Sequence, residues 1–223
     1  MTDVRPAIVL ASASPRRRAL LAEAGVDFEV LPADVDETLP AGTAPESGAV
    51  LLAARKAQAV AARIAPLVNR YVLAADTVVA VDTADGLTLL GKPDSPAEAR
   101  AMLAALSGTR HRVVTGVCAL RAHDRREEVA FERTFVQMRV IAPAEIEAYV
   151  VSGEWRDKAG GYAIQETADQ FVVALEEGGF DNVVGLPVQL ALELLRRIGA
   201  PCPLLKGGLS SSAQTRAEKP RSP

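Results

Sequence analysis

Apolar and polar positions follow two different periods along the chain, and the change from one to the other predicts an α/β protein. The segment "PAIVLAS" at 6–12 is a short apolar run that ends in small residues, as expected of a buried strand. The segment "RRRALLAEA" at 16–24 predicts a helix, with Ser14 as the N-cap, Pro15 at the first position and Gly25 as the stop signal. The alternating segment "DFEVLP" then predicts a second strand, so the chain opens as strand, helix, strand.

A second helix is predicted over about 46–64. Thr43 and Glu46 have the spacing of a capping box, with Pro45 between them. Lys56 falls outside the apolar stripe of this helix, which is predicted to consist of Val50, Leu51, Ala54, Ala61 and Ile64.

The middle of the chain predicts a hairpin and a helix. The segment "RYVLAADTVVAVD" is a long strand signal, and "DTADGL" supplies an Asp-Gly turn. Ser95, Pro96 and Glu98 then repeat the cap-and-proline signal for a helix that ends near Gly108.

The remaining segments predict two strands, a helix, a strand with a turn, and a closing helix. In order these are "HRVVTGVCALRA", "EEVAFERTFVQMRVI", "PAEIEAYVVSG", "QFVVALEEGGFDNVVG" and "LPVQLALELLRRIG". From about residue 206 the sequence "KGGLSSSAQTRAEKPRSP" cannot bury an apolar face. We therefore expect one domain over 1–205 and a disordered polar tail over 206–223.

The composition of the chain excludes several functional classes of protein. Of 223 residues, 49% are hydrophobic and 24% charged, and the formal net charge is −3, so no basic excess is available to coat a nucleic acid polymer. Two histidines and the widely separated Cys118 and Cys202 form no metal-binding or redox pattern. Because no apolar run could span a bilayer and no signal peptide is evident, we expect a cytoplasmic protein without a membrane partner.

Three consecutive arginines, at 16–18, stand at the predicted start of the first helix. The peptide dipoles already make that end of a helix positive, so cations there are mildly unfavourable. The arginines are therefore either solvated at a small penalty or placed there to bind an anion. The two common phosphate-binding motifs, G-x-x-x-x-G-K-[ST] and G-x-G-x-x-G after the first strand, are both missing.

A single carboxylate, Asp76, interrupts the apolar strand "LAADTVVAV". It faces solvent at a strand end, or it is a water-activating base or metal ligand in a partly dry cleft. Lys92 in "LLGKPD" is either a solvated turn residue or a ligand-binding cation. The segment "DKAGGYAIQ" is either a plain loop or a close approach to a ligand, where Gln165 could pair with a nucleobase edge. His111 and His123 are expected at the surface.

Taken together, these motifs resemble one family. The segments "SASPRR", "DVDE", "ARKA", "AADTVV", "GKP", "SGTRHRVVTGV", "DKAGGYAIQ" and "NVVGLP" occur in the order and spacing of the Maf family of nucleoside triphosphate pyrophosphatases. The resemblance covers about residues 6–198. It implies a mixed twisted α/β sheet flanked by helices, with two lobes around a deep cleft.

The resemblance also implies a reaction and a site. The family hydrolyses a nucleoside triphosphate between its α- and β-phosphates, giving the monophosphate and pyrophosphate, and requires a divalent cation such as Mg²⁺ or Mn²⁺. Asp76 matches the proton acceptor and, with Glu37, a candidate metal ligand. Arg16, Thr77 and Gln165 match positions linked to substrate choice. The full set of substrate-binding positions is Ser12, Arg16, Arg17, Lys56, Thr77, Lys92, Lys158 and Gln165.

The segments "ADT" and "YAIQ" resemble the family branch that acts on dTTP and UTP. Glu166 departs from that branch, which usually has glycine after the glutamine. Glu166 keeps open the same reaction on modified pyrimidine nucleotides or 7-methyl-GTP. The family resemblance also implies a second alternative, a nucleotide-sensing regulator of septum formation. The expected partner is the nucleoside triphosphate, and a homodimer is compatible with the sequence.

Overall fold

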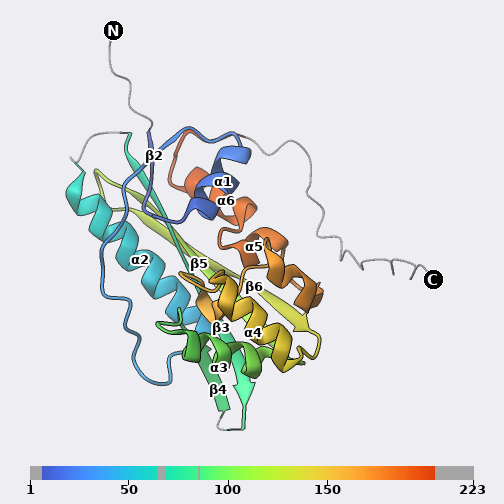
Figure 1. The fold of residues 1–223 in the computed structure, drawn as a ribbon. Coiled ribbons are helices and arrows are strands. Elements are labelled where there is room, and N and C mark those ends of the chain that lie inside the picture. The colour runs from blue at the N-terminus through green and yellow to red at the C-terminus, as the bar shows by residue number, and fades with distance from the viewer. Residues whose placement is uncertain (1–6, 65–68, 85, 204–223) are drawn as a thin grey trace.

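A seven-stranded mixed sheet forms the centre of the computed structural model, which describes residues 7–64, 69–84 and 86–203 (Figure 1). The strand order is β2-β1-β3-β5-β6-β7, and β4 pairs with β3 outside this series. β1 runs parallel to β2 and β3, and the other pairs are antiparallel. The strands are β1 (Ile8–Leu10), β2 (Phe28–Val30), β3 (Tyr71–Thr83), β4 (Gly86–Leu90), β5 (Arg110–Arg121), β6 (Glu127–Met138) and β7 (Val172–Glu176).

Helices flank this sheet, as the sequence predicted. They are α1 (Pro15–Glu23), α2 (Pro45–Arg63), α3 (Pro96–Leu106), α4 (Pro143–Ser152), α5 (Phe180–Val184) and α6 (Val188–Arg197), with short 3₁₀ turns η1 (Ala159–Gly161) and η2 (Thr167–Phe171). No helix in the described part of the chain is long and apolar enough to cross a membrane. The predicted turn at Asp85 and the predicted tail at 206–223 lie outside the described residues.

The side chains of β3 alternate between the two faces of the sheet. Leu73 and Ala75 pack against α1 and α6 on one face. Further along the same face, Val79 and Val81 pack against α3 and α4. The opposite face is covered by α2 (Figure 1). Thr77 therefore lies between the two apolar halves of one face.

One edge of β3 is open at its centre. β5 covers one edge of β3 along most of its length. On the other edge, β1 pairs only with residues 71–73 and β4 only with residues 79–83. In the part of the chain that the structure describes, residues 74–78 therefore have no neighbouring strand on this edge. Asp76 and Thr77 lie in this gap, on opposite faces of the sheet.

The predicted helix starts are confirmed in two of three cases. The Ser14 and Ser95 hydroxyls accept hydrogen bonds from the backbone N–H groups three residues later, so both are N-caps. The capping box at Thr43 is wrong: α2 begins at Pro45, and the Thr43 hydroxyl donates to the carbonyl of Pro40. The Thr43 hydroxyl is therefore used in a turn with Pro40 and does not cap α2.

The predicted apolar stripe of α2 is wrong in part: Ala61 is buried, and Ala54 and Ile64 pack against the core, but most of the buried face consists of other residues. Its buried residues are mostly small, including Gly48, Ala49 and Ala53, whereas Leu51 is exposed. Lys56 lies on this buried face rather than away from it. The helix approaches the sheet closely, so small side chains fill most of the contact.

Two local predictions near the end of the sheet need correction. The segment 180–184 was expected to be a turn and instead forms the short helix α5. His111 was expected at the surface but is fully buried, and its Nε2 lies 2.8 Å from the Tyr162 hydroxyl. Its place on the inward face of β5 explains the burial, because the alternation along a strand fixes the face regardless of polarity.

Replacing Gly116 with alanine should destabilise the fold strongly. A Cβ at Gly116 would lie 2.2 Å from the carbonyl carbon of Ala49, so the backbone of α2 would have to move away from β5. We expect a loss of about 1–3 kcal/mol, the range of overpacked cores. Chemical denaturation measures it. Gly91→Ala is the control, since its Cβ would meet no atom within 4 Å, and an equal loss there would contradict the packing argument.

Burial lowers the pKa of His111 to about 4 from its ordinary 6.5. Between these values the unfolded chain binds a proton that the folded chain does not, so the free energy of unfolding falls as the pH drops through this window. At pH 5 the loss is about 2 kcal/mol. We expect His111→Gln, which keeps a hydrogen-bonding partner for Tyr162, to show a shallower decline between pH 7 and 5 in urea titrations. Parallel profiles for the two proteins would refute this role.

Candidate active site

A cavity of about 520 Å³ opens at the uncovered edge of β3. Eight parts of the chain line it: the loop after β1 with the start of α1, the loop after β2, α2, β3, the loop after β4, β5, and the segments at 157–165 and 183–185. The ten residues that the sequence singled out all line this one cavity: Ser12, Arg16, Arg17, Glu37, Lys56, Asp76, Thr77, Lys92, Lys158 and Gln165. The structure thus brings the predicted site residues together, and their chemical roles stay predictions.

The Lys56 side chain forms the centre of a charged cluster on the α2 side of the sheet. Its ammonium nitrogen contacts Asp76 Oδ1 and lies 2.7 Å from Glu37 Oε1. Lys92 lies 3.6 Å from the second Glu37 oxygen. Lys56 and Asp76 are both buried. Because a buried charge needs a partner, α2 supplies the cation that allows β3 to carry a carboxylate here.

The charges of this cluster act on Glu37. Partial burial by itself would raise the pKa of Glu37. The hydrogen bond from Lys56 and the positive charges of Lys56 and Lys92 outweigh burial, so its pKa lies below the ordinary value. Glu37 is therefore an anion at neutral pH and remains available to bind a cation.

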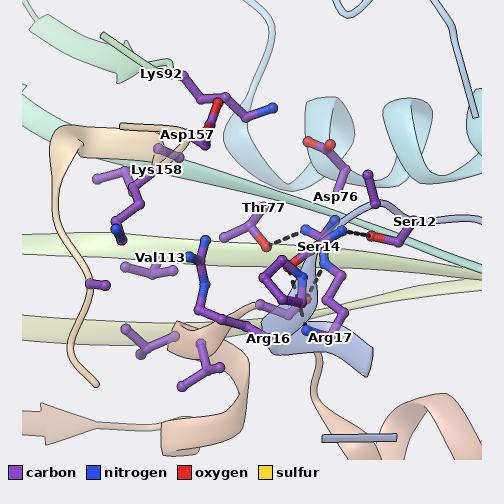
Figure 2. Close-up of a pocket in the computed structure, with 18 of the residues that line it drawn as sticks. Ser12, Ser14, Arg16, Arg17, Asp76, Thr77, Lys92, Val113, Asp157 and Lys158 are labelled. Carbon is purple, nitrogen blue, oxygen red and sulfur yellow. Dashed lines mark hydrogen bonds between the residues drawn. The ribbon is translucent and has the colours of Figure 1, made fainter. Parts of the chain in front are cut away.

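The start of α1 holds two arginines in different surroundings. Ser14 caps the helix by accepting from the Arg17 backbone N–H at 3.4 Å, and Ser12 Oγ accepts from the Ser14 N–H at 3.2 Å. Arg17 Nε donates to the carbonyl of Gly185 at 2.7 Å, and its Nη2 donates to the Thr77 hydroxyl at 3.0 Å. Figure 2 shows the Arg16 side chain between Lys158 and Thr77. Arg17 is therefore anchored to the cavity wall, whereas Arg16 reaches into the cavity.

Lys158 lies on the far side of the cavity from Asp76 (Figure 2). Its ammonium donates to the carbonyl of Glu154 and lies 3.0 Å from Glu166 Oε2. Glu166, the residue that departs from the sequence pattern, therefore neutralises this lysine. The three lysines that line the cavity thus differ in their partners, since Lys56 and Lys92 lie near Glu37 and Lys158 pairs with Glu166.

Several apolar side chains line the part of the cavity between Asp76 and Lys158, which the Arg16 side chain also enters (Figure 2). Val79 of β3 and Val113 of β5 are direct cross-strand neighbours and line the cavity together with Ile164 and Val183. The exposed side chain of Gln165 adds an amide to this part of the wall. A flat apolar ring with a polar edge suits such a surface, since ligand cavities combine apolar walls with a few placed polar groups.

The residues could hold a divalent cation only together with a ligand. In the described segments, no three His, Cys, Asp or Glu side chains form a group that could bind a metal ion. Glu37 and Asp76 nevertheless converge on one ammonium nitrogen, so their carboxylates lie close together. Mg²⁺ commonly takes one or two protein carboxylates and completes its shell with water and substrate phosphates. The donor set fits that mode of binding.

Sequence reasoning missed the residues that support the site from below. Thr115 and Asn182 are fully buried and connect Thr77 to α5 by hydrogen bonds. Gly185 supplies the carbonyl that anchors Arg17. All three occur in the quoted motifs "SGTRHRVVTGV" and "NVVGLP". Polar residues within otherwise apolar segments were the signal that could have identified Thr115 and Asn182.

Comparison with known proteins agrees with this architecture. Residues 7–198 match the family described as Maf-like protein. A dTTP/UTP pyrophosphatase of Myxococcus xanthus (strain DK1622) is 48% identical over 196 residues, which cover 88% of this chain and 94% of that protein. A dTTP/UTP pyrophosphatase of Caulobacter vibrioides (strain ATCC 19089 / CIP 103742 / CB 15) is 47% identical over 195 residues, covering 87% and 96%.

The family match takes in nearly the whole described chain, including every element that lines the cavity. The similarity to the two relatives extends over most of this chain and almost the full length of each relative. This chain therefore belongs to the Maf family.

Proposed function

We propose that this protein hydrolyses dTTP and UTP between the α- and β-phosphates, releasing the nucleoside monophosphate and pyrophosphate. The observation that carries the proposal is Asp76, a buried carboxylate held by Lys56 at the edge of a cavity that also presents Arg16 and Lys92. The names of the similar proteins support the same substrates. Pyrophosphate release from dTTP and UTP in the presence of Mg²⁺ or Mn²⁺ tests it directly.

The phosphates occupy the charged end of the cavity. A triphosphate carries several negative charges, and its hydrolysis depends mainly on positioning and charge neutralisation. The start of α1 offers free backbone N–H groups to an anion, and Arg16 adds a planar guanidinium suited to phosphate oxygens. Lys92 is exposed at the opposite rim and can move onto the phosphates from there.

Asp76 acts as the general base. Lys56 holds Oδ1, which leaves Oδ2 to accept a proton from the water that attacks the α-phosphorus. The fixed position of Lys56 on α2 prevents the carboxylate from rotating away. Glu37 and Asp76 would hold a Mg²⁺ or Mn²⁺ ion together with the phosphates. When bound, such an ion neutralises part of the charge on the phosphate oxygens.

Glu166 favours a second candidate, in which the same reaction acts on modified nucleotides. Glu166 follows Gln165 in the sequence, and its carboxylate pairs with Lys158, which lines the cavity. The 7-methylguanine ring carries a positive charge and would compete with Lys158 for that carboxylate. A substrate panel that includes 7-methyl-GTP and modified pyrimidine triphosphates distinguishes the two. The cytoplasmic location and the homodimer stay predictions from the sequence.

Replacing Asp76 with asparagine should abolish most turnover while leaving nucleotide binding intact. The amide keeps the shape of the side chain but cannot take a proton, so we expect kcat to fall about 10²- to 10⁴-fold, as for loss of a general base. Pyrophosphate release and the Kd for UTP measure the two effects separately.

Asp82→Asn is the matched control for this prediction. Asp82 is an exposed aspartate on the same strand, and it pairs with Arg112 rather than lining the cavity. Its variant should hydrolyse UTP at the wild-type rate. Wild-type turnover by Asp76→Asn would remove Asp76 from the role of base.

Replacing Gln165 with alanine should flatten the preference among nucleotides more than it lowers the overall rate. An amide that pairs with the base edge rejects bases that leave its polar groups unmatched, and alanine removes that penalty. Competition assays with dTTP, UTP, CTP and GTP measure the ranking. Gln170→Ala, a nearby exposed glutamine outside the cavity lining, is the control. If the ranking of the Gln165 variant matches wild type, Gln165 does not read the base.

A further inference from the structure

A chain of hydrogen bonds beneath the cavity has only one consistent direction. The Thr115 hydroxyl donates to the carbonyl of Asn182 at 3.0 Å, because a carbonyl can only accept. The Thr77 and Thr115 hydroxyl oxygens lie 3.0 Å apart. Since Thr115 has already used its hydrogen, Thr77 must be the donor in this pair.

The same logic fixes the remaining capacity of the Thr77 hydroxyl. Arg17 Nη2 donates to it at 3.0 Å, and a guanidinium has no acceptor. Thr77 thus gives its one hydrogen to Thr115 and accepts one from Arg17. A hydroxyl oxygen has two lone pairs, so Thr77 keeps one free acceptor and no free donor for a ligand in the cavity.

Thr77 lies at the boundary between the apolar floor of the cavity and its charged end. On the same face of β3 it precedes Val79, whose cross-strand neighbour is Val113, whereas Asp76 projects from the opposite face. A base resting on the valines therefore has its edge within reach of Thr77. Gln165 can distinguish bases by the position of their polar groups, but its amide can rotate to present a donor or an acceptor, so the choice between uracil and cytosine needs a group of fixed polarity.

We infer that Thr115 is a positioning residue that locks the Thr77 hydroxyl as a hydrogen-bond acceptor, and that this polarity selects uracil and thymine over cytosine. The inference rests on the proposed function. Uracil and thymine carry one N–H donor on the base edge, at N3, whereas N3 of cytosine is an acceptor. An acceptor-only Thr77 satisfies the first two bases and opposes a lone pair in the third.

The test is the ratio of kcat/KM for UTP to kcat/KM for CTP in wild type and in Thr115→Val. Valine has the shape of threonine without the hydroxyl, so the hydrogen of Thr77 becomes free to bond N3 of cytosine. We expect the ratio to fall about tenfold, mainly because CTP turnover rises, as expected for one gained hydrogen bond. Thr115→Ser keeps the hydroxyl and should restore the wild-type ratio.

Thr134→Val is the matched control. Thr134 is another fully buried threonine, and its hydroxyl accepts from Asn182 Nδ2 at 2.8 Å without contacting Thr77. Its loss should lower the melting temperature and leave the ratio unchanged. If Thr115→Val does not fold, Thr77→Val tests directly whether the Thr77 hydroxyl accepts a hydrogen bond from N3 of uracil. Removal of this acceptor should lower UTP turnover and leave CTP turnover unchanged.

The outcomes separate this inference from the function on which it depends. If wild type hydrolyses neither dTTP nor UTP, the proposed function is wrong. If wild type is active and prefers UTP but Thr115→Val keeps the wild-type ratio, the function stands and the inference is overturned. An equal fall of the ratio in Thr134→Val also overturns it, because the change would then reflect general loosening of the core.

Discussion

The site depends on one constraint: strand β3 runs without interruption along β5 while its other edge is bare between β1 and β4. The gap gives access to both faces of the same strand. Consecutive side chains of a strand point to opposite faces, so Asp76 serves one face and Thr77 the other. A ligand at this edge therefore meets an acid and a hydroxyl from adjacent residues without any special turn, and the sheet fixes the distance between them.

The charged half of the site is held by Lys56. A buried ammonium is unfavourable without partners, and here Asp76 and Glu37 supply two. This one side chain links α2, β3 and the loop after β2. The carboxylates are thereby positioned before any ligand arrives, which in the proposed reaction would reduce reorganisation.

Much of the fold and most of the site could be predicted from the sequence, for identifiable reasons. Ser14 and Ser95 are caps whose geometry is local, so the residues beside them were enough. Lys56 was misplaced because the burial of α2 depends on how closely it approaches the sheet, which no local pattern records. His111 was misplaced for a related reason, since polarity suggested the surface while the strand register placed it inside. Contacts between residues far apart in the sequence, such as Thr115 with Asn182, could be identified only from the three-dimensional structure.

Gly116 on β5 is the cross-strand neighbour of Asp76. Because glycine has no side chain, the backbone of β5 at Gly116 packs directly against the backbone of α2 at Ala49. The spacing between α2 and β5 is therefore set by contact between backbone atoms and not by side-chain rotamers. Lys56 stands two turns further along that helix. The backbone contact between α2 and β5 therefore fixes where the Lys56 ammonium lies relative to Asp76 and Glu37. Repacking of neighbouring side chains would not change this position.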